Sequence, residues 1–260
     1  MPELPEVEMA RRYLEATALR QTIRKAEVKD ERMLAKVSAK KVEEALAGQQ
    51  FLSALRHGKR LFLKLHDFLW LALHLGLTGR LIYLESRAEE PSHTRLRVTF
   101  ENGHILAFDD PRIFGEVSLT ESPEAFLEER RIGPDALQID REGFLKIMSG
   151  RRGLIKPTLL NQSLIAGLGN LYADESLFLA GICPKTRGLD EMQLINLFSS
   201  IQEVLKVALS THADLEKLPD SFLLPHRYPG GTCPRDGALL RHEKIQGRTS
   251  YFCPVHQKKV

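Results

Sequence analysis

The 260-residue chain has few cysteines, no long apolar run and little net charge. Its three cysteines cannot form a disulfide framework, and Cys183 stands alone before a proline. No run approaches the roughly 20 apolar residues of a membrane span, and the N-terminus lacks the basic and then apolar pattern of a signal peptide. These absences predict a cytoplasmic protein that does not act on membranes.

The net charge of +3 permits nucleic-acid binding, but only local clusters of basic residues can argue for it. With 43% hydrophobic and 27% charged residues, the composition is that of an ordinary globular protein. The length suffices for one large domain or two modest ones. The chain contains no internal repeat and no low-complexity tract.

Hydrophobic periodicity predicts one helix over about 5–19 and then short strands from about 22 to 120. The ENG at 101–103 indicates a hairpin. Beyond Ser122 the pattern becomes helical. The expected helices are 123–130, 140–149, 156–161, 170–180 and 190–213. The fold class is therefore α+β and multidomain: a helix with a β-sandwich (1–121), a helical domain (122–222) and a C-terminal hairpin (223–260).

The opening MPELPEVE could carry chemistry. If Met1 is removed, Pro2 has a free secondary α-amine, which titrates near ~8 and is partly nucleophilic at neutral pH. Glu3 and Glu6 place carboxylates close to it, and an amine beside an acid suits Schiff-base chemistry. The simpler alternative is a helix start, which favours proline and acidic residues.

Two short knuckles near the C-terminus have the spacing of a structural zinc site. They are Cys233-x2-Asp236 and Cys253-x2-His256, with sixteen residues between them. Aspartate is an unusual fourth ligand, and His242 is a rival for that place. The other alternative is a pair of unrelated thiols. We expect one structural Zn²⁺, around which this segment folds.

Two segments could contact phosphates. KIQGRTSYF reads as a hairpin with Arg248 near its tip, although such a tip is often merely solvated. In GLGNLYADES, Gly169 permits close backbone approach and Asn170 would cap the following helix, leaving N–H groups for an anion. A simple turn is the alternative there. No G-x-x-x-x-G-K-[ST] or G-x-G-x-x-G motif follows a strand in this region, so a duplex fits better than a nucleotide.

Three places in the strand-rich half also stand out. Lys59 lies at an expected turn tip in RHGKRLF, and Leu77 lies in the glycine-flanked turn of HLGLTGRL. DDPRIFG places Arg112 and Phe114 on a loop. An apolar wedge beside an arginine could fill the gap left by an extruded base. Taken singly, each has an ordinary alternative that is the more common one: Lys59 in a solvated turn, Leu77 in the core and Phe114 in the core at a strand edge.

Together these motifs resemble the formamidopyrimidine-DNA glycosylase family, with endonuclease VIII-type enzymes as relatives. MPELPEVE, HLGLTGRL, DDPRIFG, GLGNLYADESLFLAGI and GRTSYFCP-x2-Q stand in the family's order across nearly the whole chain. The resemblance implies an N-terminal β-sandwich with a leading helix, a helix–two-turns–helix domain and a zinc finger. It also implies a bacterial, nucleoid-associated monomer that binds double-stranded DNA containing oxidised bases or abasic sites.

The resemblance implies a bifunctional DNA glycosylase and abasic-site lyase of base excision repair, with no redox cofactor. Pro2 would attack C1′ and form the Schiff base, while Glu3 would shuttle protons during β,δ-elimination. Lys59 and Arg248 would complete the catalytic set and hold phosphates. Glu6 would help to hold the site, and Glu175 would support the N-terminal amine and Glu3.

The DNA contacts implied by the resemblance come from both halves of the chain. Arg112 and Phe114 would enter the duplex with Leu77 as third filler. Other expected DNA-binding residues are His74, Lys156, Gly169 and Asn170.

The chain departs from the family pattern at several places. Leu77 stands where methionine is usual, and Ile113 where a basic residue is frequent. Asp236 and His256 replace two cysteines of the finger. The stretch before Cys233 is short and lacks the usual loop over an everted purine. Abasic sites are therefore the safer substrate, and which oxidised base is excised stays open. The alternatives to the enzyme are a damaged-DNA binding protein on the same scaffold and a zinc-dependent hydrolase.

Overall fold

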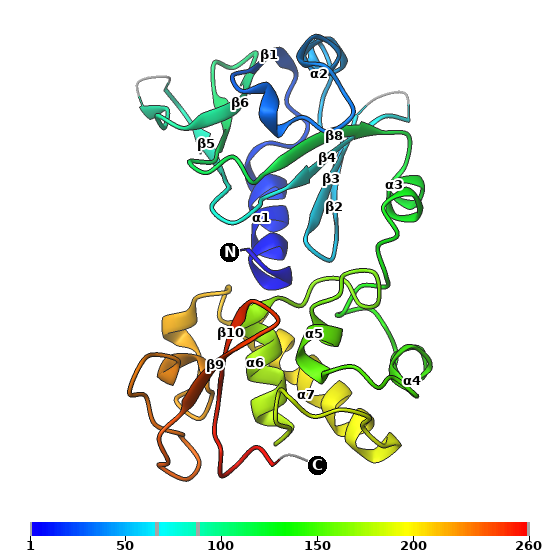
Figure 1. The fold of residues 1–260 in the computed structure, drawn as a ribbon. Helices are drawn as coiled ribbons and strands as arrows, with labels where there is room; N and C mark the ends of the chain where they lie inside the picture. The colour runs from blue at the N-terminus through cyan, green and yellow to red at the C-terminus, as the bar shows by residue number, and fades with distance from the viewer. Residues whose placement is uncertain (1, 66–67, 87–88, 259–260) are drawn as a thin grey trace. The chain divides into compact units, whose positions relative to one another are not determined.

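The computed structural model describes residues 2–65, 68–86 and 89–258, which form two compact units (Figure 1). The first unit contains Pro2 and Glu6–Arg131, and the second contains Glu3–Pro5 and the residues from Ile132 onward. Helix α3 (Pro123–Glu129) belongs to the first unit, and the C-terminal hairpin belongs to the second. The finer division into 1–121, 122–222 and 223–260 remains a prediction.

The first unit is a β-sandwich of two four-stranded antiparallel sheets, as expected. One sheet has the order β1-β6-β7-β5 and the other the order β2-β3-β4-β8. Their inner faces share one hydrophobic core with the leading helix. The strands are β1 (Ile23–Val28), β2 (Ser53–His57), β3 (Arg60–Lys64), β4 (Trp70–His74), β5 (Arg80–Leu84), β6 (Thr94–Phe100), β7 (Ile105–Asp109) and β8 (Glu116–Thr120).

The leading helix α1 (Leu4–Thr17) follows its sequence pattern. Val7 and Leu14, two turns apart on the same face of the helix, are both fully buried. The expected ENG hairpin is confirmed between β6 and β7, where Gly103 takes a φ of +87°. A second helix, α2 (Ala39–Leu46), was not expected. Its signal was present in the sequence: Ser38 caps it, and Val42 and Leu46 are buried at i,i+4 spacing.

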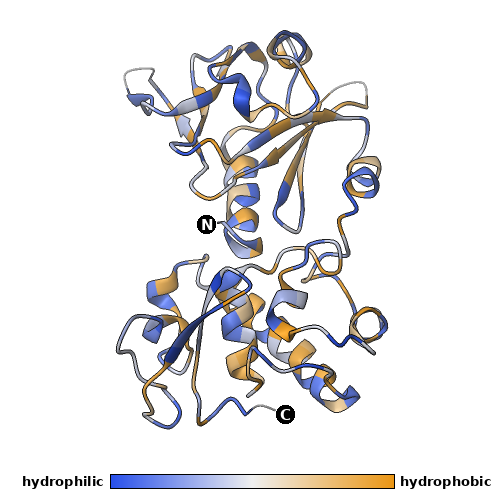
Figure 2. Ribbon diagram, viewed as in Figure 1, coloured by the Kyte–Doolittle hydropathy of each residue, from blue (hydrophilic) through white to orange (hydrophobic). Residues whose placement is uncertain are grey.

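The second unit is mainly helical, and Figure 2 shows the apolar residues gathered along its helices. Its core joins four helices, and Leu4 of the N-terminal segment is buried in the same core. The helices are α4 (Arg141–Met148), α5 (Ile155–Leu159), α6 (Asn170–Leu179) and α7 (Glu191–Ser210). All four lie within a residue or a few of their expected positions. The α+β fold class is thereby confirmed.

The C-terminal hairpin consists of β9 (Arg241–Ile245) and β10 (Arg248–Phe252). Its turn is Gln246–Gly247, with φ of +45° and +79°, the conformation of a tight primed hairpin turn. The segment has a small core of its own, which Phe178 of α6 completes together with Cys233, Tyr251 and Cys253. Apolar packing against α6 therefore stabilises this segment in addition to any stabilisation by a metal ion.

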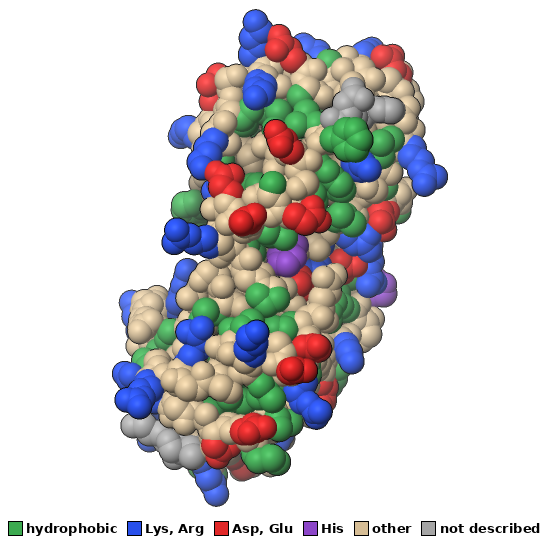
Figure 3. Space-filling model, turned by 90° about the vertical axis from the view of Figure 1, so that its right-hand side faces the viewer, with side chains coloured by type: hydrophobic (Ala, Val, Ile, Leu, Met, Phe, Trp, Pro, Cys, Tyr) green, Lys and Arg blue, Asp and Glu red, His purple; other side chains and the backbone are tan. Residues whose placement is uncertain are grey.

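None of the helices in the described part of the chain has the length and apolar character needed to cross a bilayer. On the face shown in Figure 3, Lys and Arg side chains are interspersed with Asp and Glu side chains. This distribution matches the small net charge of +3.

Candidate active site and nucleic-acid interface

The carboxylate of Glu3 is held by hydrogen bonds at the start of α6. Glu3 is fully buried, and three backbone N–H groups at the start of α6 donate to it. The N···O distances are 2.8 Å from Gly169, 2.8 Å from Leu171 and 3.2 Å from Tyr172. A helix N-terminus favours negative charge, so α6 both orients this carboxylate and stabilises its charged form.

Two glycines make room for the N-terminal segment against α6. A Cβ on Gly169 would lie 2.2 Å from Cδ of Glu3, and a Cβ on Gly167 would lie 2.5 Å from Leu4 Cδ1. Gly167 also has a φ of +117°, which L side chains rarely adopt. The expected close approach to the glycine backbone is present, but the N–H groups do not point outward to an external anion. The anion at this helix start is the chain's own Glu3, and a phosphate contact by Gly169 remains a prediction.

Asn170 does not cap α6 as expected. The N-cap is Gly169, and Asn170 is the first helical residue. Its Nδ2 donates to the Thr249 carbonyl of β10 at 3.0 Å, which ties the start of α6 to the hairpin. Its Oδ1 is buried without a partner in the described structure, so one acceptor is left for a further donor.

Lys156 lies inside the second unit, which corrects the expected direct contact with DNA. The side chain is fully buried, and its Nζ donates to Asp174 Oδ1 at 2.6 Å and to Ser250 Oγ at 2.7 Å. Burial lowers the pKa of Lys156 and raises the pKa of Asp174, and the opposite charge of the partner offsets part of each shift. The role of Lys156 in this structure is to join α5, α6 and β10.

Arg227 completes this internal network. Its Nε and Nη2 donate to Asp174 Oδ2 at 3.1 and 3.0 Å, and Nη2 also donates to the Thr249 carbonyl at 3.0 Å. Its guanidinium lies over the Tyr251 ring, 4.8 Å from the centroid. The segment before the finger is therefore fastened to α6 and β10.

Glu175 also binds this segment, through the backbone. Its two carboxylate oxygens accept hydrogen bonds from the backbone N–H groups of Leu223, at 2.9 Å, and Leu224, at 2.7 Å. Burial raises the pKa of Glu175 to about 7. Both oxygens of Glu175 thus bind the backbone at residues 223 and 224. The expected support of Glu3 and the N-terminal amine remains a prediction.

Arg248 is exposed at the first position of β10, directly after the hairpin turn, as predicted. Residue 249 uses its carbonyl to bind Asn170 and Arg227. The buried network therefore fixes the backbone next to Arg248 while leaving the guanidinium open to a ligand. Such an arrangement suits a phosphate, which a guanidinium binds with two parallel hydrogen bonds.

In the first unit, Lys59 lies in the two-residue turn between β2 and β3, as predicted. His74 is the last residue of β4, and its Nδ1 accepts the N–H of Gly76 at 3.2 Å. Burial and the nearby charges of Arg60 and Lys59 lower the pKa of His74 to about 3. His74 is therefore neutral at physiological pH, and a DNA contact by it would be a hydrogen bond and not an ion pair.

The expected duplex-entering residues lie on two turns of the first unit. Leu77 is half-buried in the turn between β4 and β5, and Arg112 and Phe114 are exposed on the loop between β7 and β8. The Arg112 guanidinium carbon is 4.9 Å from the Phe114 ring centroid. The predicted loop placement is confirmed, whereas the DNA contacts remain predictions.

Pro2 is half-buried and directly precedes Glu3, and Glu6 is half-buried in the first turn of α1. The expected removal of Met1 lies outside the described residues. The covalent link places the Pro2 nitrogen two peptide units before α1, whose N-terminal end carries partial positive charge.

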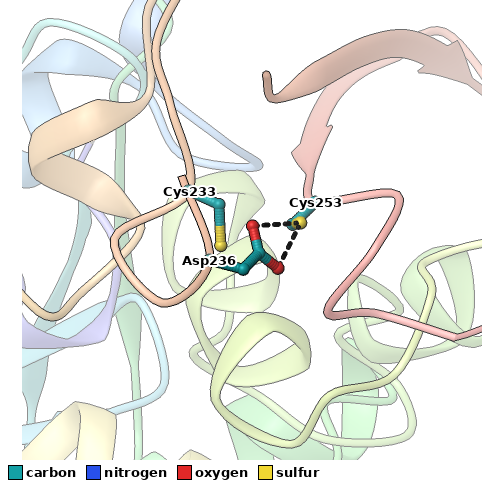
Figure 4. Close-up of side chains that lie close together, drawn as sticks. All are labelled: Cys233, Asp236 and Cys253. Carbon is teal, nitrogen blue, oxygen red and sulfur yellow. Dashed lines mark hydrogen bonds between the residues drawn. The ribbon is translucent and has the colours of Figure 1, made fainter. Parts of the chain in front are cut away.

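Three of the four expected metal ligands come together (Figure 4). The ligand atoms of Cys233, Asp236 and Cys253 all lie within 4.8 Å of one another, and Cys253 Sγ is 3.2 Å from Asp236 Oδ2. The N–H groups of Val255 and His256 donate to this sulfur at 3.3 and 3.2 Å. Two thiols and a carboxylate fit a zinc ion, and the two cysteines are buried.

The fourth position is where the prediction departs from the structure. His256 turns its Nε2 to the Phe178 carbonyl at 2.8 Å and is not part of the ligand cluster. The rival, His242, stacks on Tyr251 with 5.4 Å between ring centroids. Neither histidine is a ligand in this arrangement.

The sequence did not reveal that Asp174 and Arg227 bind each other inside the second unit. It also did not reveal Asp110, whose carboxylate accepts hydrogen bonds from Thr78 and Gly115. Asp174 sits beside Glu175 on α6, but no local pattern links it to Lys156, eighteen residues earlier. Asp110 had a weak signal, because Asp-Pro marks a turn that an aspartate side chain often bonds.

Comparison with known proteins agrees with this layout. Residues 1–117 match the formamidopyrimidine-DNA glycosylase N-terminal domain, and 132–218 match the H2TH domain of the same enzymes. Enzymes named formamidopyrimidine-DNA glycosylase from Pelotomaculum thermopropionicum and Solibacter usitatus are 33% and 35% identical, over 99% and 100% of this chain and 99% and 100% of theirs.

Solved structures are equally similar. The Lactococcus lactis formamidopyrimidine-DNA glycosylase, bound non-covalently to DNA with an abasic site, has a TM-score of 0.90 and 32% identity. The match covers 99% of this chain and 100% of that one. A MutM structure with DNA containing carbocyclic 8-oxoguanine has a TM-score of 0.89 and 32% identity, with the same coverage. This chain belongs to the formamidopyrimidine-DNA glycosylase family.

Proposed function

We propose that the protein is a bifunctional DNA glycosylase and abasic-site lyase of base excision repair. The nucleophile is the α-amine of Pro2, and the substrates are formamidopyrimidine lesions and abasic sites in double-stranded DNA. The observation that carries the proposal is the placement of Glu3: a buried carboxylate, fixed by three N–H groups, in the residue next to the amine.

The chemistry follows from this pairing. The Pro2 nitrogen bonds to C1′ while the C1′–base bond breaks, and the base leaves with that electron pair and takes up a proton. The proton released from the Pro2 nitrogen passes to Glu3 and then to the sugar ring oxygen as the ring opens, which gives the Schiff base. Loss of the 2′ proton with the 3′ phosphate, and then of the 4′ proton with the 5′ phosphate, cuts the strand on both sides.

The remaining roles are distributed over both units. Lys59 and Arg248 hold phosphates beside the lesion, and Asn170 adds the second N–H of its Nδ2, whose first N–H binds the Thr249 carbonyl. Leu77, Arg112 and Phe114 replace the extruded base. Lys156, Asp174 and Arg227 fix β10 so that Arg248 is presented at a constant position.

A structural zinc ion is part of the proposal. Cys233, Asp236 and Cys253 would hold it, with a fourth position taken by a rotated His256 or by water. The ion would fix the ends of the two knuckles on either side of the hairpin and would take no part in the chemistry.

The segment before the finger bears on which substrates are processed well. Residues 223–226 are fastened to Glu175, and Arg227 is fastened to Asp174, so this short segment has little freedom to close over a base. A Lactococcus lactis relative has been seen with DNA containing Fapy-dG, and the MutM relative with carbocyclic 8-oxoguanine. Excision of 8-oxoguanine by this chain should be weaker than its cutting at abasic sites.

The test is borohydride trapping on duplexes carrying a formamidopyrimidine, 8-oxoguanine, 5-hydroxycytosine or an abasic site. The native N-terminus should give a covalent adduct and strand cleavage, strongest at the abasic site. A tag joined directly to the Pro2 nitrogen converts the amine to an amide and should abolish both, whereas the same tag at the C-terminus should not. DNA binding without any adduct would instead support the alternative, a damaged-DNA binding protein on the same scaffold.

A further inference from the structure

Two turns of the first unit touch each other through their backbones. Gly76 belongs to the turn between β4 and β5, and a Cβ at this position would lie 2.4 Å from the carbonyl carbon of Phe114. Phe114 belongs to the loop between β7 and β8. The turn that carries Leu77 and the loop that carries Arg112 and Phe114 are therefore direct neighbours.

One side chain, Asp110, bonds to both turns. It is fully buried, and its Oδ1 accepts the Thr78 hydroxyl at 2.7 Å and the Arg112 N–H at 3.3 Å. Its Oδ2 accepts the Gly115 N–H at 2.7 Å. Thr78 directly follows Leu77, and Gly115 directly follows Phe114. Each of the three exposed or half-exposed side chains is thus within one residue of a bond to this carboxylate.

The loop conformation needs such support. Ile113, between Arg112 and Phe114, has a φ of +56°, which is unfavourable for a β-branched residue. Gly115 is equally constrained, because a Cβ there would lie 2.6 Å from the Phe108 ring. A carboxylate that accepts bonds on both oxygens can hold this strained loop, whereas an amide has only one accepting atom.

We propose that Asp110 is a positioning residue that joins the two turns into one rigid element, so that Leu77, Arg112 and Phe114 enter the duplex together. The inference rests on the proposed function, since it concerns how the base is extruded. It predicts that Asp110 matters when a paired base must be replaced and matters little when no base has to leave the stack.

The neighbouring Asp109 provides a matched control. It is also buried, but its Oδ2 binds Arg80 Nε at 2.9 Å, and its Oδ1 has no partner among the described residues. Neither oxygen has a hydrogen bond to the two turns in the described structure. Asp109→Asn therefore makes the same change of charge and size next door without cutting the link.

The experiment compares single-turnover excision of a formamidopyrimidine from a duplex with cleavage of an abasic site in the same duplex. Asp110→Asn should lower the first rate by roughly 10- to 100-fold, the range expected for losing hydrogen bonds to a charged group. It should change the second by less than about 3-fold. Asp109→Asn should leave the ratio of the two rates unchanged.

Thr78 gives a second, exposed route to the same test in case Asp110→Asn does not fold. Thr78→Val removes the hydroxyl that binds Asp110 and should lower excision in the same selective way, whereas Thr78→Ser keeps the hydroxyl and should behave like the wild type. The inference would be overturned if a variant lost rate equally on both substrates. It would also be overturned if neither Asp110→Asn nor Thr78→Val lowered the rate of formamidopyrimidine excision. A wild-type protein that processes neither substrate would instead refute the proposed function.

Discussion

Gly169→Ala provides the sharpest test of how the second unit holds Glu3. Gly169 has φ −126° and ψ −162°, an extended conformation that alanine tolerates, so the substitution adds a methyl group without backbone strain. The new Cβ would lie 2.2 Å from Glu3 Cδ and 2.4 Å from Glu3 Oε1. Ordinary contacts between carbon atoms are about 3.5 Å or more. The Glu3 carboxylate must therefore move by more than about 1 Å.

A displacement of this size should be costly for the reaction. The three N–H bonds to Glu3, now 2.8 to 3.2 Å long, cannot all survive it. Misplacement of a reacting group by about 1 Å typically lowers a rate on the order of 100-fold. We expect Gly169→Ala to lower the rate of borohydride trapping on abasic DNA by about that factor, while DNA affinity at equilibrium changes far less.

Gly153→Ala is the matched control. The same methyl group there meets only Thr158 Oγ1 at 3.2 Å, in the same unit and away from Glu3. The control should retain the wild-type trapping rate. If Gly169→Ala traps as fast as wild type with an unchanged fold, then the position of Glu3 does not govern the reaction, and the proposed role of α6 is wrong.

Three further predictions concern stability and the metal. Lys156→Met removes a cation from the buried Asp174 and should lower the free energy of unfolding by about 3 kcal/mol in thermal melts, whereas exposed Lys206→Met should leave it unchanged. Glu175 has a pKa raised from 4.5 to about 7, so the folded state binds its proton more tightly; stability should be fully present below about pH 4.5 and fall by roughly 3 kcal/mol as pH rises through 7. Urea unfolding at pH 5 and pH 8 should show this loss in wild type and not in Glu175→Gln, and equal losses would contradict it. Purified protein should contain about one zinc per chain by elemental analysis, and Cys253→Ser should lose the metal and melt earlier; a metal-free wild type of full stability would refute the site.

The sequence determined the order of the elements because their signals are local. The buried positions of α1 recur at helical spacing, the ENG turn sets a hairpin, and Gln246–Gly247 sets another. Glycine and proline alone were enough to predict the turns that carry Lys59 and Phe114. The helix α2 was missed although its signals, a serine cap and two buried residues four apart, were equally local.

The sequence also determined which residue types are present for the chemistry, since the order of short motifs is itself specific. Pro2 and Glu3 are adjacent in the chain, so their pairing needs no tertiary information. The same holds for Cys233 and Asp236, because one tight turn brings both side chains to one side.

Only the tertiary structure decided what each polar group binds, because those partners lie far apart in the sequence. Lys156, which the family resemblance assigned to DNA, donates hydrogen bonds to Asp174 and Ser250. Glu175 holds residues 223 and 224, and His256 turns to the Phe178 carbonyl. A buried polar group must find a partner wherever the fold supplies one, and no local pattern records where that is.

The start of α6 shows both sides of this division. Its glycines predicted an anion site from the sequence, because glycine permits close approach to free N–H groups. That the anion is Glu3, more than 160 residues away in the chain, became apparent only from the folded structure. The physical reason is that the N–H groups at a helix start bind any negative charge nearby. Which carboxylate lies there depends on how the whole chain folds.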